Sequence, residues 1–235
     1  MKTIVFDIET AGEDFDKMDS TTQKVLTRYI KDEGLDDKEY GKKLDDIKNE
    51  LVFSPLTSQI VAVGVIDAED KKGAVYYQNP KSKKDFEEDG IVFKAMDEKE
   101  ILENFWRVAS HADFFVSYNG RGFDVPFLMI RSAIHKIRPS KDLMSNRYLS
   151  MQKFGAKHID LMDQLSFYGA VWKKFSLHLA CRAFGIKSPK EDGVSGDDVT
   201  RLFGEGKYED IARYNARDLF STRELFHYWE EYLKF

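Results

Sequence analysis

The residues of this chain best suited to catalysis are four carboxylates and a tyrosine in three short segments. The segments are FDIET at residues 6–10, NGRGFD at residues 119–124 and YNARD at residues 214–218. Each places acidic oxygens where a buried element meets its edge, and oxygen ligands of this kind bind divalent cations. Two cations held about 3.5–4 Å apart can clamp the attacking and leaving oxygens of a phosphodiester displacement. The sequence therefore predicts a metal site suited to that reaction.

The first segment lies at the end of a predicted core strand. Residues 2–8 are rich in β-branched and aromatic side chains, so we expect this strand to end at the acidic pair. Asp7 and Glu9 are two residues apart, and because strand side chains alternate between faces, both carboxylates project from the same side. Charge on a central strand is costly unless it is paired or coordinates a metal. The alternative is a strand end at which these carboxylates face water.

The last segment follows a helical period. Residues 208–232 predict one long helix with an apolar stripe. Tyr214 and Asp218 are neighbours on one face of that helix, about 5–6 Å apart at Cβ. A tyrosine hydroxyl beside a metal-bound carboxylate can orient a water molecule without carrying charge. The alternative is an amphipathic helix with a tyrosine at its rim and a solvated aspartate.

The middle segment joins a predicted strand at residues 113–118 to a predicted helix at residues 125–137. Asn119 and the two glycines that follow it predict a turn between them. Asp124 suits an ordinary N-cap, since aspartate is favoured at that position. A strand–loop–helix junction is also where α/β proteins place groups that contact ligands. Both interpretations are open for this segment alone.

In this order and with these neighbours, the three segments resemble the exonuclease motifs of the DEDD superfamily of 3′–5′ exonucleases. The third segment fits the tyrosine branch, Tyr-x-x-x-Asp, and Arg213 stands where the histidine branch would need a histidine. The chain looks most like the proofreading exonuclease domains of family-B DNA polymerases and the stand-alone bacterial exonucleases related to them. The resemblance extends through HIDLMDQLSFYG at residues 158–169, FSLHLACRAFGI at 175–186 and SGDDV at 195–199.

The resemblance implies an α/β fold with a ribonuclease H-like mixed sheet flanked by helices. It also implies two divalent metal ions, Mg²⁺ or Mn²⁺, as cofactors. Asp7 would bridge both metals, and Glu9 and Asp218 would complete the site that activates water. Asp124 would hold the second metal through water, and Tyr214 would position the attacking water. These five residues are the expected catalytic residues, and the four acids among them are the expected metal ligands.

We expect substrate contacts from the motifs and from a basic stretch, at Thr10, Asn119, Phe123, Lys153 and Lys157. The whole chain is acidic, with a formal net charge of −5. Residues 131–157, in contrast, hold seven Lys/Arg against one acidic residue, together with Tyr148 and Phe154. Such a mixture is typical of surfaces that bind single strands through backbone contacts and stacking. The alternative is a solvated loop with no such role.

Composition limits the class of protein. The 235 residues, 42% of them hydrophobic, can bury one full α/β core, so we expect a single domain. The single cysteine, Cys181, excludes an internal disulfide and is typical of a reducing compartment. No apolar run approaches the ~20 residues that span a bilayer. We therefore expect a cytoplasmic protein without a membrane partner. Among the five histidines, only His158, beside Asp160, is a candidate for the site.

Apolar periodicity predicts the remaining elements. Strands are expected at residues 59–67 and 73–78, in a meander with the first strand, and helices at residues 97–110 and 176–185, with a short apolar segment at 159–161. Residues 12–54 are highly charged and predict a helical insertion that starts beside the metal site. It could serve as a lid, a substrate clamp or an interaction arm, or have no part in the reaction. Residues 86–90 and 187–193 are expected to be charged loops.

Together these features predict hydrolysis from the 3′ end of single-stranded DNA with release of nucleoside 5′-monophosphates, in the trimming of 3′ ends during DNA repair. An exonuclease that trims RNA would use the same metal chemistry, because discrimination of the sugar depends on contacts to the 2′-hydroxyl. A catalytically silent nucleic-acid-binding module is a third candidate, and the five intact motif residues argue against it.

Overall fold

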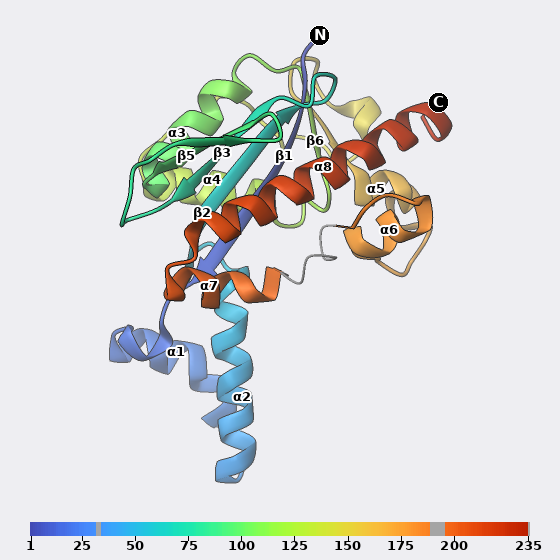
Figure 1. The fold of residues 1–235 in the computed structure, drawn as a ribbon. Coiled ribbons are helices and arrows are strands. Elements are labelled where there is room, and N and C mark those ends of the chain that lie inside the picture. The colour runs from blue at the N-terminus through green and yellow to red at the C-terminus, as the bar shows by residue number, and fades with distance from the viewer. Residues whose placement is uncertain (32–33, 189–195, 235) are drawn as a thin grey trace.

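A seven-stranded mixed sheet with helices on both faces forms the centre of the molecule (Figure 1). The computed structural model describes residues 1–31, 34–188 and 196–234. The strands are β1 (Thr3–Gly12), β2 (Ser58–Asp67), β3 (Gly73–Gln78), β4 (Phe86–Glu88), β5 (Ile91–Met96), β6 (Phe114–Ser117) and β7 (Lys157–Asp160). The helices are α1 (Ser20–Lys31), α2 (Asp37–Glu50), α3 (Glu98–Ala109), α4 (Asp124–Ile134), α5 (Leu161–Leu165), α6 (Leu177–Phe184), α7 (Val199–Glu205) and α8 (Tyr208–Tyr232). The predicted mixed sheet flanked by helices is confirmed.

Strand β1 lies inside the sheet, whose order is β4-β5-β3-β2-β1-β6-β7. It pairs antiparallel with β2, and β2 pairs antiparallel with β3, so the predicted meander is confirmed. On its other side β1 pairs in parallel with β6, but only from Thr3 to Val5. Among the described residues, no strand pairs with this edge of β1 beyond Val5. The loop and helix after β6 can therefore reach the backbone of β1.

Alternation along β1 sends neighbouring side chains into two separate cores. Phe6 and Ile8 pack on the face that α3 and α4 cover. Val5 packs on the opposite face, which the long helix α8 crosses (Figure 1). Asp7 and Glu9 share the parity of Val5, so they open toward α8. The strand thus presents its acidic pair to a helix from the far end of the chain.

The helical insertion between β1 and β2 is confirmed. Helices α1 and α2 form a hairpin that stands away from the sheet (Figure 1). Helix α2 begins with a capping box formed by Asp36 and Glu39 and buries none of its side chains. The base of the hairpin is anchored, because Leu51 is buried and the Thr10 hydroxyl donates to the Val52 carbonyl at 3.1 Å. The insertion is therefore joined directly to the strand that carries the acidic pair.

The prediction of a loop at residues 86–90 is wrong. Part of this segment forms the edge strand β4, which pairs antiparallel with β5, a strand that the sequence did not predict. The ring of Phe86 stacks on that of Phe93, with centroids 4.4 Å apart, and this contact holds the two strands together. The exposed glutamates of β4 are typical of an edge strand, where charge opposes pairing with another chain.

Two further details differ from expectation. Strand β1 continues to Gly12 instead of ending at the acidic pair, because its pairing with β2 resumes after a bulge between Glu9 and Thr10. Helix α7 was not predicted. Of the loop expected at residues 187–193, only the first two residues lie in the described part of the chain, and they form no helix or strand. Within the described ranges, no helix has the length and apolar character needed to cross a bilayer.

Candidate active site

Three acidic side chains from distant segments meet over the sheet. Asp7 and Glu9 project from β1, and Asp218 projects from α8. One carboxylate oxygen from each of the three lies within 4.8 Å of the others. Glu9 and Asp218 are buried, and Asp7 is half-buried. The structure thus brings together the acids of the first and last sequence segments.

Asp124 reaches the same strand from the β6 side. Its Oδ1 accepts a hydrogen bond from the Ile8 backbone N–H at 3.1 Å, at the edge of β1 that β6 leaves uncovered. Its charge raises the pKa of both Asp7 and Glu9, so it faces their site. The three-acid grouping nevertheless does not include it. The N-cap position of α4 is Phe123, which makes no side-chain capping bond, so Asp124 is not an ordinary N-cap.

The acids of this site repel one another strongly. Burial, followed by the charges of the neighbouring acids, raises the pKa of Asp7 and of Glu9 well above their usual values. Burial also raises the pKa of Asp124 to about 7. A hydrogen bond from Asn215 and the charge of Arg217 lower the pKa of Glu9 by less than burial raises it. Hard divalent cations would remove the repulsion, and a set of carboxylate oxygens is what such cations bind.

Tyr214 lies one helical turn before Asp218 and is buried. Burial raises the pKa of its hydroxyl far above the usual value, and the charges of Asp218 and Glu9 raise it further. The phenol therefore stays protonated at neutral pH. The charges of Asp218, Glu9 and Asp7 all raise the pKa of this hydroxyl, so it lies at the carboxylate cluster. A neutral donor in this position can orient a water molecule or an oxygen of the substrate.

Asn215 is a site residue that the sequence analysis missed. Its side chain is fully buried, and its Nδ2 donates to Asp7 Oδ2 at 2.8 Å. Gly64 lies opposite Asp7 on β2 and makes room for the amide, because a Cβ there would lie 2.2 Å from Asn215 Oδ1. The two bonded residues are 208 positions apart, so no local pattern indicates the contact. Asn215 fixes the orientation of the Asp7 carboxylate.

The three motif residues expected to contact substrate occupy different positions around the cluster. The hydroxyl of Thr10 is bonded to the insertion, so this residue connects two structural elements. Asn119 has a φ of 60°, and its backbone N–H donates to Asp160 at 2.9 Å. The ring of Phe123 lies against that of Phe53, with centroids 6.5 Å apart. Asn119 and Phe123 thus belong to the loop that delivers Asp124.

The basic stretch at residues 131–157 is only partly available to a ligand. Three of its cations already bind protein groups: Arg131 to Glu98, Arg147 to Asp163 and Lys141 to the Gly155 carbonyl. Lys153 is exposed. Lys157 begins β7 and lies level with Thr3, with β6 between the two strands. Asp7 is four residues beyond Thr3 on β1, which at 3.3 Å per residue places it about 13 Å further along the strand direction. The structure therefore does not bring Lys157 to the carboxylates.

His158 and Asp160 support the active-site loop. Burial lowers the pKa of His158 to about 3, so its ring is neutral. Its Nε2 lies 2.7 Å from Ser117 Oγ at the end of β6. The carboxylate of Asp160 accepts two backbone N–H groups of the loop at 2.9 Å each. In the described part of the chain, neither His158 nor Asp160 belongs to a group of side chains that could hold a metal ion.

The sheet order and the carboxylates on β1 define a ribonuclease H-like α/β domain. A family model described as a predicted 3′–5′ exonuclease related to the exonuclease domain of PolB matches residues 53–232, and the chain belongs to that family. Asp7 and Glu9 lie before the matched region, whereas Asp124, Tyr214 and Asp218 lie within it.

A solved structure of similar fold is the family B DNA polymerase from the hyperthermophilic archaeon Pyrobaculum calidifontis. The two share 17% sequence identity with a TM-score of 0.59, over 97% of this chain and 24% of the polymerase chain. The similarity shows the fold, and this chain spans about a quarter of the length of the polymerase. Among curated proteins, none matches the sequence significantly.

Proposed function

We propose that this protein is a metal-dependent 3′–5′ exonuclease that hydrolyses single-stranded DNA and releases nucleoside 5′-monophosphates. The observation that carries the proposal is the meeting of Asp7, Glu9 and Asp218 oxygens within 4.8 Å. Asp124, bonded to the backbone between the first two acids, supplies a fourth carboxylate. Membership of the exonuclease family supports the reaction class. The polymerase-like fold supports a nucleic acid as substrate.

Asp7, Glu9, Asp124 and Asp218 are the residues that would hold two Mg²⁺ or Mn²⁺ ions. When bound, the ions would stabilise charge on the attacking and leaving oxygens of the phosphodiester. The donor set is all carboxylate, as hard cations prefer. The raised pKa values of Asp7 and Glu9 indicate more negative charge than the surrounding side chains offset. The site therefore fits the ions that the reaction needs.

The other side chains of the site position the reactants. Tyr214 offers a protonated hydroxyl beside Asp218 and would orient the attacking water. Asn215 holds the Asp7 carboxylate from the side of α8. Asn119 and Phe123 lie on the loop before Asp124, where they would contact the terminal nucleotide. The loop that supplies Asp124 to the metal site would then also recognise the end of the strand.

The decisive experiment follows a 5′-labelled single-stranded DNA and an RNA of the same sequence. With Mg²⁺ or Mn²⁺, the DNA should give a ladder that shortens from the 3′ end, faster than the RNA, and a chelator should stop it. A 3′-labelled copy should release its label as a mononucleotide in the first turnover. Hydrolysis of a closed circle, or full activity in chelator, would refute the proposal. Faster loss of the RNA would keep the reaction and reassign the substrate.

A further inference from the structure

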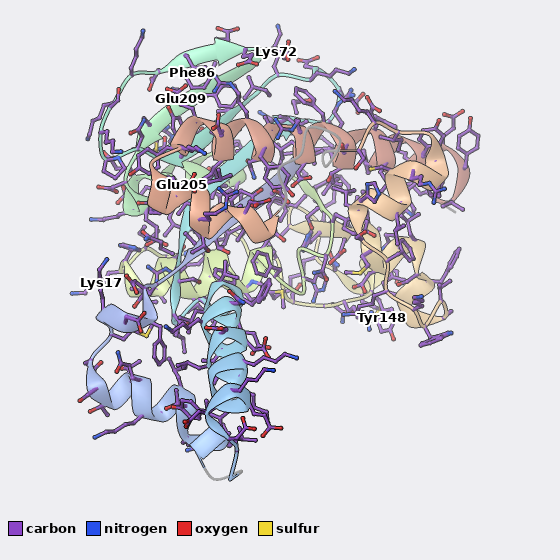
Figure 2. All side chains as sticks on the ribbon, turned by 60° about the horizontal axis from the view of Figure 1, so that its bottom comes forward. Lys17, Lys72, Phe86, Tyr148, Glu205 and Glu209 are labelled. Carbon is purple, nitrogen blue, oxygen red and sulfur yellow. The ribbon has the colours of Figure 1, made fainter. Side chains whose placement is uncertain are left out.

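The flank of the molecule beside β7 exposes several aromatic rings. Four rings in this part of the chain, which we name the aromatic face, are more than half exposed: Tyr148, Phe154, Phe167 and Trp172. Trp172 is 87% exposed. Figure 2 shows Tyr148 on the flank that carries α5 and α6, away from the insertion that carries Lys17. Single exposed apolar residues are ordinary, whereas a group of large exposed rings marks a binding surface.

The charge exposed among these rings is positive. Residues 143–181 contain five basic and two acidic residues. Both acids are engaged, because the buried Asp160 accepts backbone N–H groups and Asp163 pairs with Arg147 at 2.5 Å. The exposed ammonium groups that remain are those of Lys153, Lys173 and Lys174. A chain with a net charge of −5 therefore presents a basic surface here.

The turn that exposes Phe167 is strained and firmly held. Phe167 and Tyr168 have φ values of 49° and 56°, a region that is costly for residues with a side chain. The Tyr168 hydroxyl accepts hydrogen bonds from the Leu149 N–H at 3.1 Å and from Gln164 Nε2 at 2.9 Å. The Tyr168 ring also lies against Tyr148, with centroids 4.9 Å apart. These contacts fix the turn while the Phe167 ring stays in solvent.

A shallow cleft of about 460 Å³ lies between the loop that precedes Asp124 and the segment that follows Trp172. Its walls include Asn119, from the loop that precedes Asp124, and Lys174, two residues after Trp172. The Tyr118 hydroxyl donates to the Phe175 carbonyl at 2.7 Å, which ties the two walls together. A strand that passes Asn119 along this cleft would come to Lys174, two residues after Trp172.

We propose that the aromatic face binds the single-stranded part of a nucleic acid that lies 5′ to the end being hydrolysed. Trp172, Phe167 and Tyr148 would stack on bases, and the lysines among them would contact phosphates. Interleaved rings and lysines suit a polyanion with aromatic bases better than an apolar protein surface. The direction of the strand rests on the proposed function, whereas the binding itself does not.

Binding is measured without turnover, by fluorescence anisotropy of a labelled oligothymidylate in EDTA. The oligomer has roughly 16 nucleotides, the upper end of known single-strand site sizes. Trp172→Ala should weaken binding roughly 5- to 100-fold, as removal of a stacking ring does. Trp172→Phe should restore most of the affinity. Tyr29→Ala, which removes a ring that is 67% exposed on the insertion, is the matched control and should bind as the wild type does.

The salt dependence of binding separates phosphate contacts from stacking. Lys173→Gln should lower the slope of log affinity against log salt by roughly 0.7, the value for one lost single-strand phosphate contact. Lys24→Gln, on the exposed side of the insertion, should leave the slope unchanged. An unchanged slope in Lys173→Gln together with wild-type affinity in Trp172→Ala would overturn the proposal. So would a wild-type protein that does not bind the oligomer.

Turnover in Mg²⁺ or Mn²⁺ tests the connection with the site. The ratio of kcat/KM for the long oligomer to that for a dinucleotide should fall in Trp172→Ala by about the same factor as binding. An equal loss on both substrates would indicate a purely structural role and overturn the proposal. If the wild type binds through Trp172 but shortens no oligomer, the proposed function fails and the aromatic face stands. If it shortens oligomers with a length preference that Trp172→Ala does not change, the proposed role of the aromatic face fails and the proposed function stands.

Discussion

Two groups of buried carboxylates in this molecule have opposite surroundings. Glu98, at the start of α3, is bound by Arg131 at 2.6 Å and by His135 at 2.8 Å, and it accepts the Ile60 N–H at 2.7 Å. Burial acts to raise the pKa of Glu98, but these hydrogen bonds bring it below its usual value. Within β1, in contrast, burial and neighbouring acids raise the pKa of Asp7 and of Glu9.

On the proposed function, the difference separates a structural acid from functional ones. A buried carboxylate that only supports the fold needs a partner of opposite charge in the same chain, since an unpaired buried charge is strongly destabilising. Glu98 has such a partner in Arg131, which also donates to the Pro55 carbonyl and so fixes the segment after the insertion. On the proposed function, the β1 acids would depend instead on cations from solvent, and their repulsion would be the stability cost of the metal site.

The strongest test of this difference is Asp7→Asn. Excision of the 3′ nucleotide should fall to the background of a single-turnover assay, because the carboxylate expected to bridge both metals is lost. Stability in EDTA should stay the same or rise, since the substitution also removes repulsion. Urea unfolding beside the activity assay checks both parts. Normal excision by Asp7→Asn would refute the metal site itself.

Glu98→Gln is the matched control, with the opposite pattern expected. It leaves Arg131 buried without its charge partner and should lower the free energy of unfolding by about 3–5 kcal/mol. Below its unfolding temperature, the variant should still excise nucleotides. A Glu98→Gln variant as stable as the wild type would show that the Glu98–Arg131 pair does not stabilise the fold.

Sequence patterns predicted the central elements because those patterns are local. The apolar run of β2 and the helical period of α8 are each read within one segment. Strand β4 was missed because it is three residues long and charged, and it forms only by pairing with β5. The supports of the site were missed for a related reason. The contact of Asn215 with Asp7 and that of Arg131 with Glu98 exist only after distant segments have packed.

Acid dependence of stability gives a second test, in EDTA. Folded Asp124 has a pKa of about 7, whereas an unfolded aspartate has one of about 3.9. Between these values the folded state binds the extra proton, so this residue makes stability fall as pH rises from about 4 to about 7. Three pKa units correspond to about 4 kcal/mol at most. Asp124→Asn should remove this part of the slope.

Glu98 contributes to the pH dependence of stability with the opposite sign. Because its folded pKa is lowered, its stabilisation is present above the unfolded value of about 4.3 and is lost as pH falls. Urea unfolding of Asp124→Asn, Glu98→Gln and the wild type between about pH 2 and pH 8 separates the two contributions, because Glu98 acts below about pH 4.3 and Asp124 acts above about pH 4. An unchanged slope in Asp124→Asn would mean that Asp124 is ionised in the folded protein and is not strained by its neighbours.

A smaller effect is expected from Tyr214→Phe. The substitution removes one hydroxyl and keeps the ring, which packs in the core between α8 and the sheet, so metal and DNA should bind as before. The single-turnover rate should fall about 100-fold, at the low end of what a positioned proton donor or acceptor contributes. Tyr208→Phe, at the start of the same helix, is the control. Excision at the wild-type rate would show that the tyrosine hydroxyl has no part in the reaction and would leave the proposed role of the carboxylates unchanged.

The smallest expected effect belongs to Asn215→Ala, which removes a neighbour of a ligand and not a ligand. Loss of the bond to Asp7 Oδ2 should weaken Mn²⁺ binding about 10- to 100-fold, as loss of an outer partner typically does, with a matching fall in excision at low metal. High metal should restore most of the rate. Asn104→Ala, which removes an amide bonded to the Glu100 carbonyl, is the control and should bind Mn²⁺ normally.

Gly64→Ala tests the same contact without altering the amide. Its new methyl group would lie 2.2 Å from Asn215 Oδ1 and 2.5 Å from Leu219 Cδ1, so the amide must move away from Asp7. Calorimetry of both variants should show the same loss of Mn²⁺ affinity, because both leave Asp7 without its donor. If Asn215→Ala binds Mn²⁺ as tightly as the wild type, the Asp7 carboxylate does not need the hydrogen bond from Asn215 to bind metal. The β1 acids would then depend on metal alone, in sharper contrast to Glu98.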